Sequence, residues 1–116
     1  MSIESEVYNA LKGLVANRVF PDVAPLGTVR PFLTYQGVGG SAVNFLDPTI
    51  PSKKNKRMQI TVWADSRTAA ASLADQVEDV MRTVTVLQPT VLGAAISTFE
   101  PDTKLYGCMQ DFSLWA

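Results

Sequence analysis

Apolar and polar side chains alternate from Met58 to Ala64, the pattern expected of a strand with one buried face. Trp63 is the exception, because it puts a large aromatic ring on the otherwise polar face of this strand. We therefore expect a neighbouring segment or a neighbouring subunit to cover that face at Trp63.

After Asp65 and Ser66 the apolar period becomes that of a helix. From Ala70 to Val84 the apolar residues recur at steps of three and four, and the charged residues fall mainly between them. Ser66 or Asp65 is the expected N-cap, because a short side-chain oxygen there can accept hydrogen bonds from the first turn. A strand that leads directly into a helix indicates an α/β or α+β fold, not a helical bundle.

The rest of the chain predicts a second helix and three more strands. The helix begins after an N-cap at Ser2, and its apolar stripe consists of Ile3, Val7, Ala10, Leu11 and Leu14. The strands are predicted at 32–38, 94–99 and 105–115, with a hairpin turn at 100–104 and a proline-containing extended connection at 15–30. The sequence therefore predicts one small α+β domain over residues 1–116, with about four strands in a mixed or antiparallel sheet and two helices packed on one face.

The segment Gly39–Arg57 has little periodicity, contains Pro48 and Pro51, and ends in a basic run. We predict a long loop or an extended, mobile hairpin arm over 39–57. Loops of this length in small domains are usually functional or disordered.

Composition limits the classes of function. The chain has 116 residues, 47% of them hydrophobic, with a formal net charge of −1 and a sequence pI near 5.2. These values fit one modest core and argue against an obligatory polyanion binder. Acidic residues near the N-terminus and the lack of an apolar run of about 20 residues predict neither a signal peptide nor a membrane span. The single cysteine, Cys108, cannot form an intramolecular disulfide and is expected as a small core residue in a reducing compartment.

The chain has no histidine. The usual zinc ligands, the usual neutral-pH general base and the common activated-nucleophile pairs are therefore missing. The helical carboxylates are expected to be solvated: Glu4, Glu6, Asp75, Glu78 and Asp79. We predict no enzymatic activity, no metal site and no cofactor.

Three features are candidates for contacts. Four cations lie within five residues, at Lys53, Lys54, Lys56 and Arg57. This cluster fits a solvated base of the loop, a docking surface for an acidic protein partner, or contacts with nucleic-acid phosphates. Trp63 suits a protein interface better than a base-stacking platform, because no pattern of interleaved aromatic and basic residues surrounds it. The apolar side chains of the arm, Phe45, Leu46 and Ile50, either fold back onto their own domain or anchor onto another subunit.

Three stretches in this order carry a family resemblance: Arg18–Gln36 (RVFPDVAPLGTVRPFLTYQ), Met58–Ala74 (MQITVWADSRTAAASLA) and Pro101–Trp115 (PDTKLYGCMQDFSLW). Together they resemble the tail completion protein family of long-tailed bacteriophages and prophages, which is similar to the tail terminators. The resemblance spans most of the chain, although the segment Gly39–Lys56 carries no recognisable motif.

The resemblance implies a structural protein of the virion, made in the host cytoplasm. It implies a ring, typically a hexamer, at the head-proximal end of the tail, where it caps the tail tube and joins the head. The implied partners are the tail tube protein and a head–tail connector protein, and DNA would pass through the ring without specific binding. The alternatives are a head-side connector or stopper component, or a small nucleic-acid-binding module that uses the cluster Lys53–Arg57. We predict interface roles for Phe45, Leu46, Ile50, Lys53, Lys54, Lys56, Arg57 and Trp63.

Overall fold

Two long antiparallel strands form the centre of the sheet. A computed structural model describes residues 2–116 and places β3 (Asn55–Ala64) beside β6 (Leu105–Trp115). Their register runs from Asn55 opposite Trp115 to Ala64 opposite Tyr106. The strand thus begins three residues before Met58, at Asn55.

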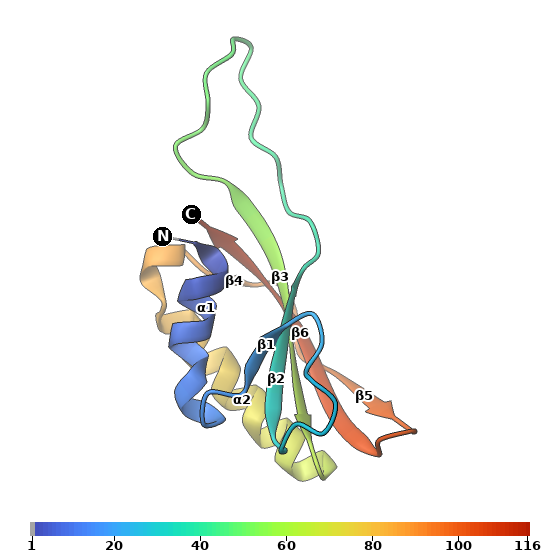
Figure 1. Cartoon of the computed structure of the whole chain (residues 1–116). Helices are drawn as coiled ribbons and strands as arrows, with labels where there is room; N and C mark the ends of the chain where they lie inside the picture. Colours follow the sequence, from blue (N-terminus) through green and yellow to red (C-terminus); the bar gives the residue numbers. More distant parts are fainter. Residues whose placement is uncertain (1) are drawn as a thin grey trace.

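The flanking strands complete a six-stranded mixed sheet (Figure 1). On one side of β3 lies β2 (Phe32–Gly37), and β1 (Val19–Pro21) runs parallel to β2. On the far side of β6 lie β4 (Thr90–Val91) and β5 (Ile96–Glu100), which pair with different halves of that strand. A hairpin turn joins β5 to β6, as predicted from the sequence.

Two helices cover one face of this sheet (Figure 1). The first, α1 (Ile3–Leu11), continues as the short 3-10 helix η1 (Lys12–Leu14), and Ser2 caps it by accepting a hydrogen bond from the Ser5 N–H. The second, α2 (Arg67–Thr83), is followed by η2 (Thr85–Leu87). Ser66, not Asp65, is its N-cap, because the Ser66 hydroxyl accepts from the Ala69 N–H at 3.1 Å.

The core fills the space between the helices and the sheet. Met58, Ile60, Val62 and Ala64 of β3 point into it and are at most 2% exposed. The core residues of the other main elements are Val7, Leu11, Ala70, Leu73, Val77, Met81, Leu33, Cys108, Phe112 and Leu114. Cys108 is buried in β6, which confirms its predicted place in a strand of the core.

The structure confirms a single small α+β domain with two helices on one face of the sheet, whereas the expected number of strands was too low. The two strands that were not predicted, β1 and β4, have three and two residues, so they are too short to show a period of two. β1 also contains Pro21, which is tolerated because this strand lies at the edge of the sheet. Both strands form because a longer neighbouring strand, β2 for β1 and β6 for β4, offers backbone hydrogen-bond partners, not because of a local sequence pattern.

The segment between β2 and β3 extends away from the domain as a long arm (Figure 1). It makes the molecule elongated, with extents of 51 × 25 × 25 Å. The Cα radius of gyration is 15.0 Å, compared with roughly 13 Å for a compact domain of this length. We call residues 38–54 the arm, because Asn55, Lys56 and Arg57 belong to β3.

Candidate assembly interface

The base of the arm is tied to the end of the sheet. On one side, the Val38 N–H donates to the Arg57 carbonyl at 2.8 Å and the Arg57 N–H to the Gly39 carbonyl at 2.7 Å. On the other side, Lys54 and Ala116 exchange two backbone hydrogen bonds of 2.7 and 3.1 Å. The direction in which the arm leaves the domain is therefore set by the backbone.

Gly40 is required at this exit. Its φ is +142°, and a Cβ there would lie 2.7 Å from the Asn55 carbonyl oxygen. Without a side chain, the backbone can pass close to Asn55, whose side-chain oxygen accepts from the Ser41 N–H at 2.8 Å. Gly40 thus allows two backbone segments to pass close to each other.

The outer part of the arm leaves large apolar side chains uncovered. Phe45 is 52% exposed, Leu46 is fully exposed and Ile50 is 79% exposed. A turn lies between Leu46 and Ile50, where an Asp47 carboxylate oxygen accepts from the Thr49 N–H at 2.9 Å. Hydrogen bonds from the side chain and the backbone of Thr49 hold the pKa of Asp47 below its usual value. Leu46 and Ile50 therefore do not fold back onto their own domain, whereas Phe45 is half-covered near the root of the arm.

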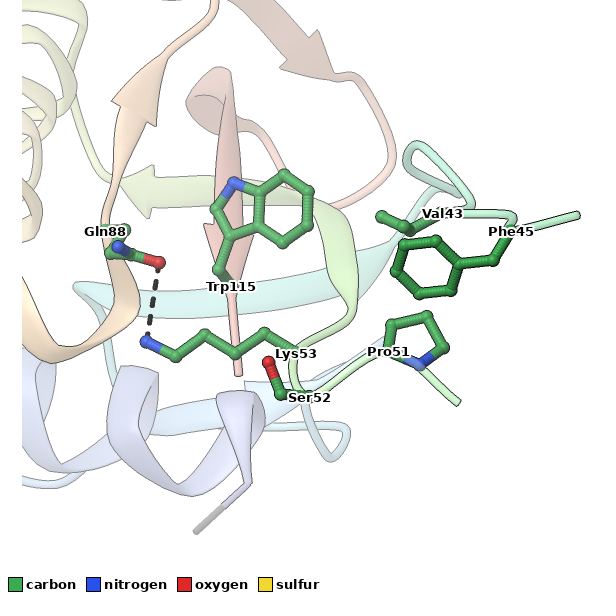
Figure 2. Close-up of a pocket in the computed structure, with 7 residues that line it drawn as sticks. All are labelled: Val43, Phe45, Pro51, Ser52, Lys53, Gln88 and Trp115. Carbon is green, nitrogen blue, oxygen red and sulfur yellow. Dashed lines mark hydrogen bonds between the residues drawn. The ribbon is translucent and has the colours of Figure 1, made fainter. Parts of the chain in front are cut away.

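A shallow, open depression of about 490 Å³ lies at the root of the arm (Figure 2). It is lined by Val43 and Phe45 from the half of the arm that follows β2, and by Pro51 and Lys53 from the half that leads into β3. Trp115 lines it from the end of β6. The Lys53 ammonium donates to the side-chain oxygen of Gln88 at 3.4 Å. Lys53 therefore connects the arm to the segment after η2.

The structure separates the four cations that lie together in the sequence. Lys53 and Lys54 belong to the arm, whereas Lys56 and Arg57 are consecutive residues of β3 and point to opposite faces of the sheet. Arg57 lies on the open face of the sheet, the face that the helices do not cover. There it forms an ion pair of 2.7 Å with Asp111, and the Gln59 amide also donates to the Asp111 carboxylate. These residues therefore do not form one continuous basic patch for phosphates.

Trp63 lies half-buried on the open face of the sheet, at the end opposite the arm. Its Nε1 donates to the Thr34 hydroxyl at 3.3 Å, and its ring lies over Gly107. A Cβ at Gly107 would come within 2.9 Å of the Trp63 ring and 2.8 Å of the Thr98 methyl group. The absent side chain at Gly107 makes the space that the indole occupies.

A groove of about 420 Å³ begins at Trp63, and we call it the Trp63 groove. Its apolar surface comes from Phe32, Trp63 and Leu105 on the sheet and from Val23 and Leu26 on the loop 22–30. The loop is held by Arg30, which pairs with Asp65 at 3.0 Å and donates to the Thr103 carbonyl at 2.6 Å. A segment of the same chain thus forms one wall beside Trp63, and the groove between that wall and the sheet stays open.

The rim of the Trp63 groove is acidic. Asp22, Glu100 and Asp102 line it, and among residues 2–116 none of these carboxylates forms an ion pair. The one cation in the lining, Arg30, is already paired with Asp65. The groove therefore offers apolar surface beside unpaired negative charge.

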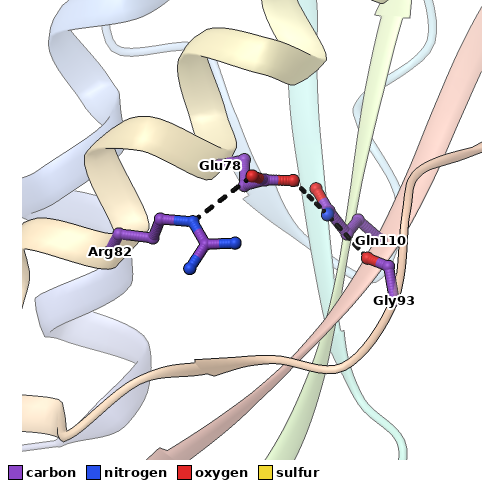
Figure 3. A network of polar contacts seen from close by, with 4 residues as sticks. All are labelled: Glu78, Arg82, Gly93 and Gln110. Atoms are coloured by element: carbon purple, nitrogen blue, oxygen red, sulfur yellow. Dashed lines mark hydrogen bonds and ion pairs between the residues drawn. The ribbon is translucent and has the colours of Figure 1, made fainter.

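Sequence reasoning missed a buried polar network on the helix-covered face (Figure 3). Gln110 is only 6% exposed, and its amide donates to the Glu78 carboxylate at 2.7 Å and to the Gly93 carbonyl at 2.8 Å. Arg82 pairs with the same carboxylate at 3.3 Å. Glu78 was expected to be simply solvated, which is wrong because this carboxylate satisfies a buried amide. The sequence feature that could have indicated this network is Gln110, a polar residue among the apolar residues on the buried face of β6.

The described part of the chain shows no group of three or more metal-ligating side chains. Within residues 2–116, no helix is both long and apolar enough to cross a membrane. The features that stand out are surfaces suited to contacts between macromolecules: the arm with its exposed apolar residues, and the Trp63 groove.

A family model described as "Tail completion protein gp17" matches residues 6–116. The chain belongs to this tail completion family. The resemblance drawn from three short stretches is thereby confirmed over residues 6–116. The family is structural, which argues against catalysis, and it makes this chain a structural protein of a bacteriophage tail, located in the virion.

The fold of this family member is also found in a solved virion structure. A chain of "Virion of native gene transfer agent (GTA) particle" matches with a TM-score of 0.61 and 16% sequence identity, covering 98% of this chain and 93% of that chain. At this identity the likeness shows the fold. A comparison with curated proteins gave no significant match.

Proposed function

We propose that the protein assembles as a homo-oligomeric ring, a hexamer, at the head-proximal end of the tail. There it ends polymerisation of the tail tube and provides the surface to which the head joins. The observation that carries the proposal is the arm, which presents Leu46 and Ile50 without cover from its own domain and leaves Phe45 half-exposed. Exposed apolar surface of this kind marks sites of protein contact.

The position of the arm suits a head-to-tail ring. A ring needs two different patches on each subunit, so that each copy contacts the next in a head-to-tail manner. The arm leaves one end of the β3–β6 pair, whereas Trp63 lies at the other end. The two candidate surfaces are therefore different and separated, as a closed ring requires.

The proposed partners follow from the family. The arm and the Trp63 groove serve contacts between subunits, and the ends of the ring contact the tail tube protein and a head–tail connector protein. The residues assigned to interfaces are Phe45, Leu46, Ile50, Lys53, Lys54, Lys56, Arg57 and Trp63. DNA passes through the ring without specific binding, in keeping with the dispersed cations and the net charge of −1.

Electron microscopy of the purified protein mixed with tail tubes tests this proposal. A ring is expected at one end of each tube, with light scattering reporting the stoichiometry. A protein that stays monomeric and never associates with tubes would contradict the proposal. Monomers in the absence of tubes would not, because a ring can depend on its tube for assembly.

Tails from a phage that lacks this protein distinguish a terminator from a head-side connector or stopper. Overlong or ragged tubes are expected for a terminator. Tubes of normal length that fail to join heads would instead identify a connector. Salt-dependent DNA binding, reduced by neutralising Lys53, Lys54, Lys56 and Arg57, would favour the nucleic-acid-binding alternative.

A further inference from the structure

We infer that the arm adds a strand to the sheet of a neighbouring copy of this chain. Residues 41–46 of one subunit pair antiparallel with the free edge of β5 in the next subunit. The inference rests on the proposed ring and names the contact that joins each subunit to the next. Backbone hydrogen bonds hold this contact together, and the side chains select its register.

The outer edge of β5 is open. β5 has five residues and is the longest of the three strands at the edges of the sheet, since β1 has three and β4 has two. Within residues 2–116 it pairs with β6 alone, in a continuous register without a bulge. Proteins usually protect such edges with proline, lysine or a bulge. The sequence ISTFE of β5 contains neither proline nor lysine, so this edge is suited to pairing with another strand.

The contacts of Arg67 show which backbone groups of β5 point outward. The Arg67 guanidinium donates to the carbonyl oxygens of Thr98 and Gly107, each at 2.7 Å. These two residues face each other in the sheet, and one guanidinium reaches both oxygens only if both lie between the strands. They are therefore a hydrogen-bonded pair. Because such pairs alternate along antiparallel strands, Ser97 and Phe99 direct their N–H and C=O groups away from β6.

The next pair of residues agrees with this alternation. Phe99 faces Tyr106, and their ring centroids are 4.9 Å apart. Side chains approach most closely in pairs that share no backbone hydrogen bonds. The backbone groups of Phe99 are thus free to bond a strand added outside β5.

The arm supplies an extended segment with an unpaired backbone. Within residues 2–116, the N–H and C=O groups of residues 42–46 form no hydrogen bond, and residues 41–46 are all exposed. Among arm residues only Gly39 and Gly40 have positive φ, so the segment 41–46 can adopt a strand conformation. The half of the arm that leads into β3 is less suited, because Pro48 and Pro51 have no N–H.

Side chains and charges favour one antiparallel register. With Val43 opposite Phe99, Leu46 lies opposite Ile96, so the apolar side chains of the two segments meet on both faces. Residues 41–46 and 96–99 carry no charge. The carboxylates at positions 47 and 100 come to lie at opposite ends of the contact in this register, whereas a parallel arrangement would bring them close together. The pairing therefore brings no like charges into contact.

The arm cannot reach β5 of its own subunit. Its root at Asn55 lies opposite Trp115, whereas Ile96 lies opposite Met109. These positions are six residues apart along β6, or roughly 20 Å at the usual rise per residue of a strand. The arm also extends away from the sheet, while β5 lies at its other end (Figure 1). The contact must therefore join two subunits, and it does so head to tail.

Disulfide cross-linking on tail tubes tests the register. A chain carrying both Leu46→Cys and Ile96→Cys is assembled and oxidised. Opposite residues that share no hydrogen bond have Cα atoms about 4.5 Å apart, within the range that a disulfide spans. Because each chain then links to the next, a series of covalent oligomers is expected on a non-reducing gel. Phe45→Cys with Ile96→Cys is the matched control, since successive strand residues point to opposite faces, and it should give little cross-link. The native Cys108 is buried and common to all chains.

The outcomes separate this contact from the proposed function. Rings at tube ends without the expected cross-link, or with an equal cross-link in the Phe45→Cys control, would overturn the strand contact and leave the ring in place. Dimers formed by Ile96→Cys alone would show that β5 pairs with β5 of another copy, which would also overturn it. Absence of rings from the wild-type chain would overturn both the contact and the proposed function.

Proline substitutions in the arm test the backbone hydrogen bonds directly. Val43→Pro removes the N–H that would donate to the Phe99 carbonyl of the neighbour, so ring formation should be lost. Asn44→Pro removes an N–H that points away from β5 in this register, and it should assemble normally. Both N–H groups are unbonded within residues 2–116, so neither variant should change Tm appreciably. Equal assembly, or equal loss of assembly, by the two folded variants would overturn the strand contact.

Discussion

The two ends of β3 differ in what covers them. At the Met58–Ala64 end, the helices bury one face of the strand, and even the polar Gln110 on neighbouring β6 is satisfied. Beyond Asn55 the same chain becomes an arm whose apolar side chains contact solvent. The comparison teaches that hydrophobic residues of this protein have two environments, because those on the helix-covered face of β3 form the core, whereas Leu46 and Ile50 of the aperiodic arm are exposed.

Truncation of a core aromatic should have the largest effect on stability. Phe112 is fully buried between α2 and the sheet, so Phe112→Ala is expected to lower the free energy of unfolding by about 3–5 kcal/mol. Leu46→Ala in the arm is the control, because Leu46 is fully exposed, and it should change the free energy of unfolding by less than about 0.5 kcal/mol. Denaturant unfolding measures both. Similar losses for the two variants would mean that the arm packs against the domain in solution.

A methyl group at Gly107 should have the next largest effect. Its Cβ would meet the Trp63 ring and the Thr98 methyl group at less than 3.0 Å, and overpacking of this kind costs about 1–3 kcal/mol. Gly13→Ala is the control, because no atom lies within 4 Å of a Cβ there. Thermal unfolding measures the loss of stability in each variant. A Gly107→Ala variant as stable as the wild type would show that Trp63 moves freely, and the groove would then be poorly defined.

The buried polar network predicts a smaller, pH-dependent effect. The hydrogen bond from Gln110 holds the pKa of Glu78 below its usual value, and Arg82 acts in the same direction. A depressed pKa in the folded state stabilises the protein above the unfolded-state pKa of about 4.3, and this contribution is lost as the pH falls through the folded-state value. Wild-type protein should therefore exceed Glu78→Gln in Tm at pH 6, and the gap should close toward pH 3. Parallel Tm curves for the two proteins across this range would contradict the role of the Glu78 charge.

A substitution at the exposed arm residue Leu46 should have the smallest effect on stability and the largest effect on ring assembly. Leu46→Ser is expected to change the free energy of unfolding by less than about 0.5 kcal/mol, because the side chain is fully exposed. Ring formation on tail tubes, scored by electron microscopy, should be lost. Val86→Ser serves as the control with an exposed apolar residue outside the proposed contact, and it should assemble normally. Normal rings with Leu46→Ser would remove Leu46 from the interface.

Local pattern was enough to predict the elements that are long and regular. The alternation in β3, the three-and-four spacing in α2 and the serine caps all act within a few residues, so the sequence alone determined both helices, the four main strands and the buried place of Cys108. The presence of apolar residues in a segment without periodicity also marked the arm as unusual.

Only the tertiary structure decided the features that depend on residues far apart in the chain. The short strands β1 and β4 form because β2 and β6 offer them partners, and Glu78 is tied to Gln110 across 32 positions. The Trp63 groove needs the loop 22–30, the end of β3 and the β5–β6 turn together. Likewise, the pleat separates Lys56 from Arg57, which the sequence had grouped as one basic cluster. Residue types and periods are local properties, whereas surfaces arise only when the fold brings distant segments together.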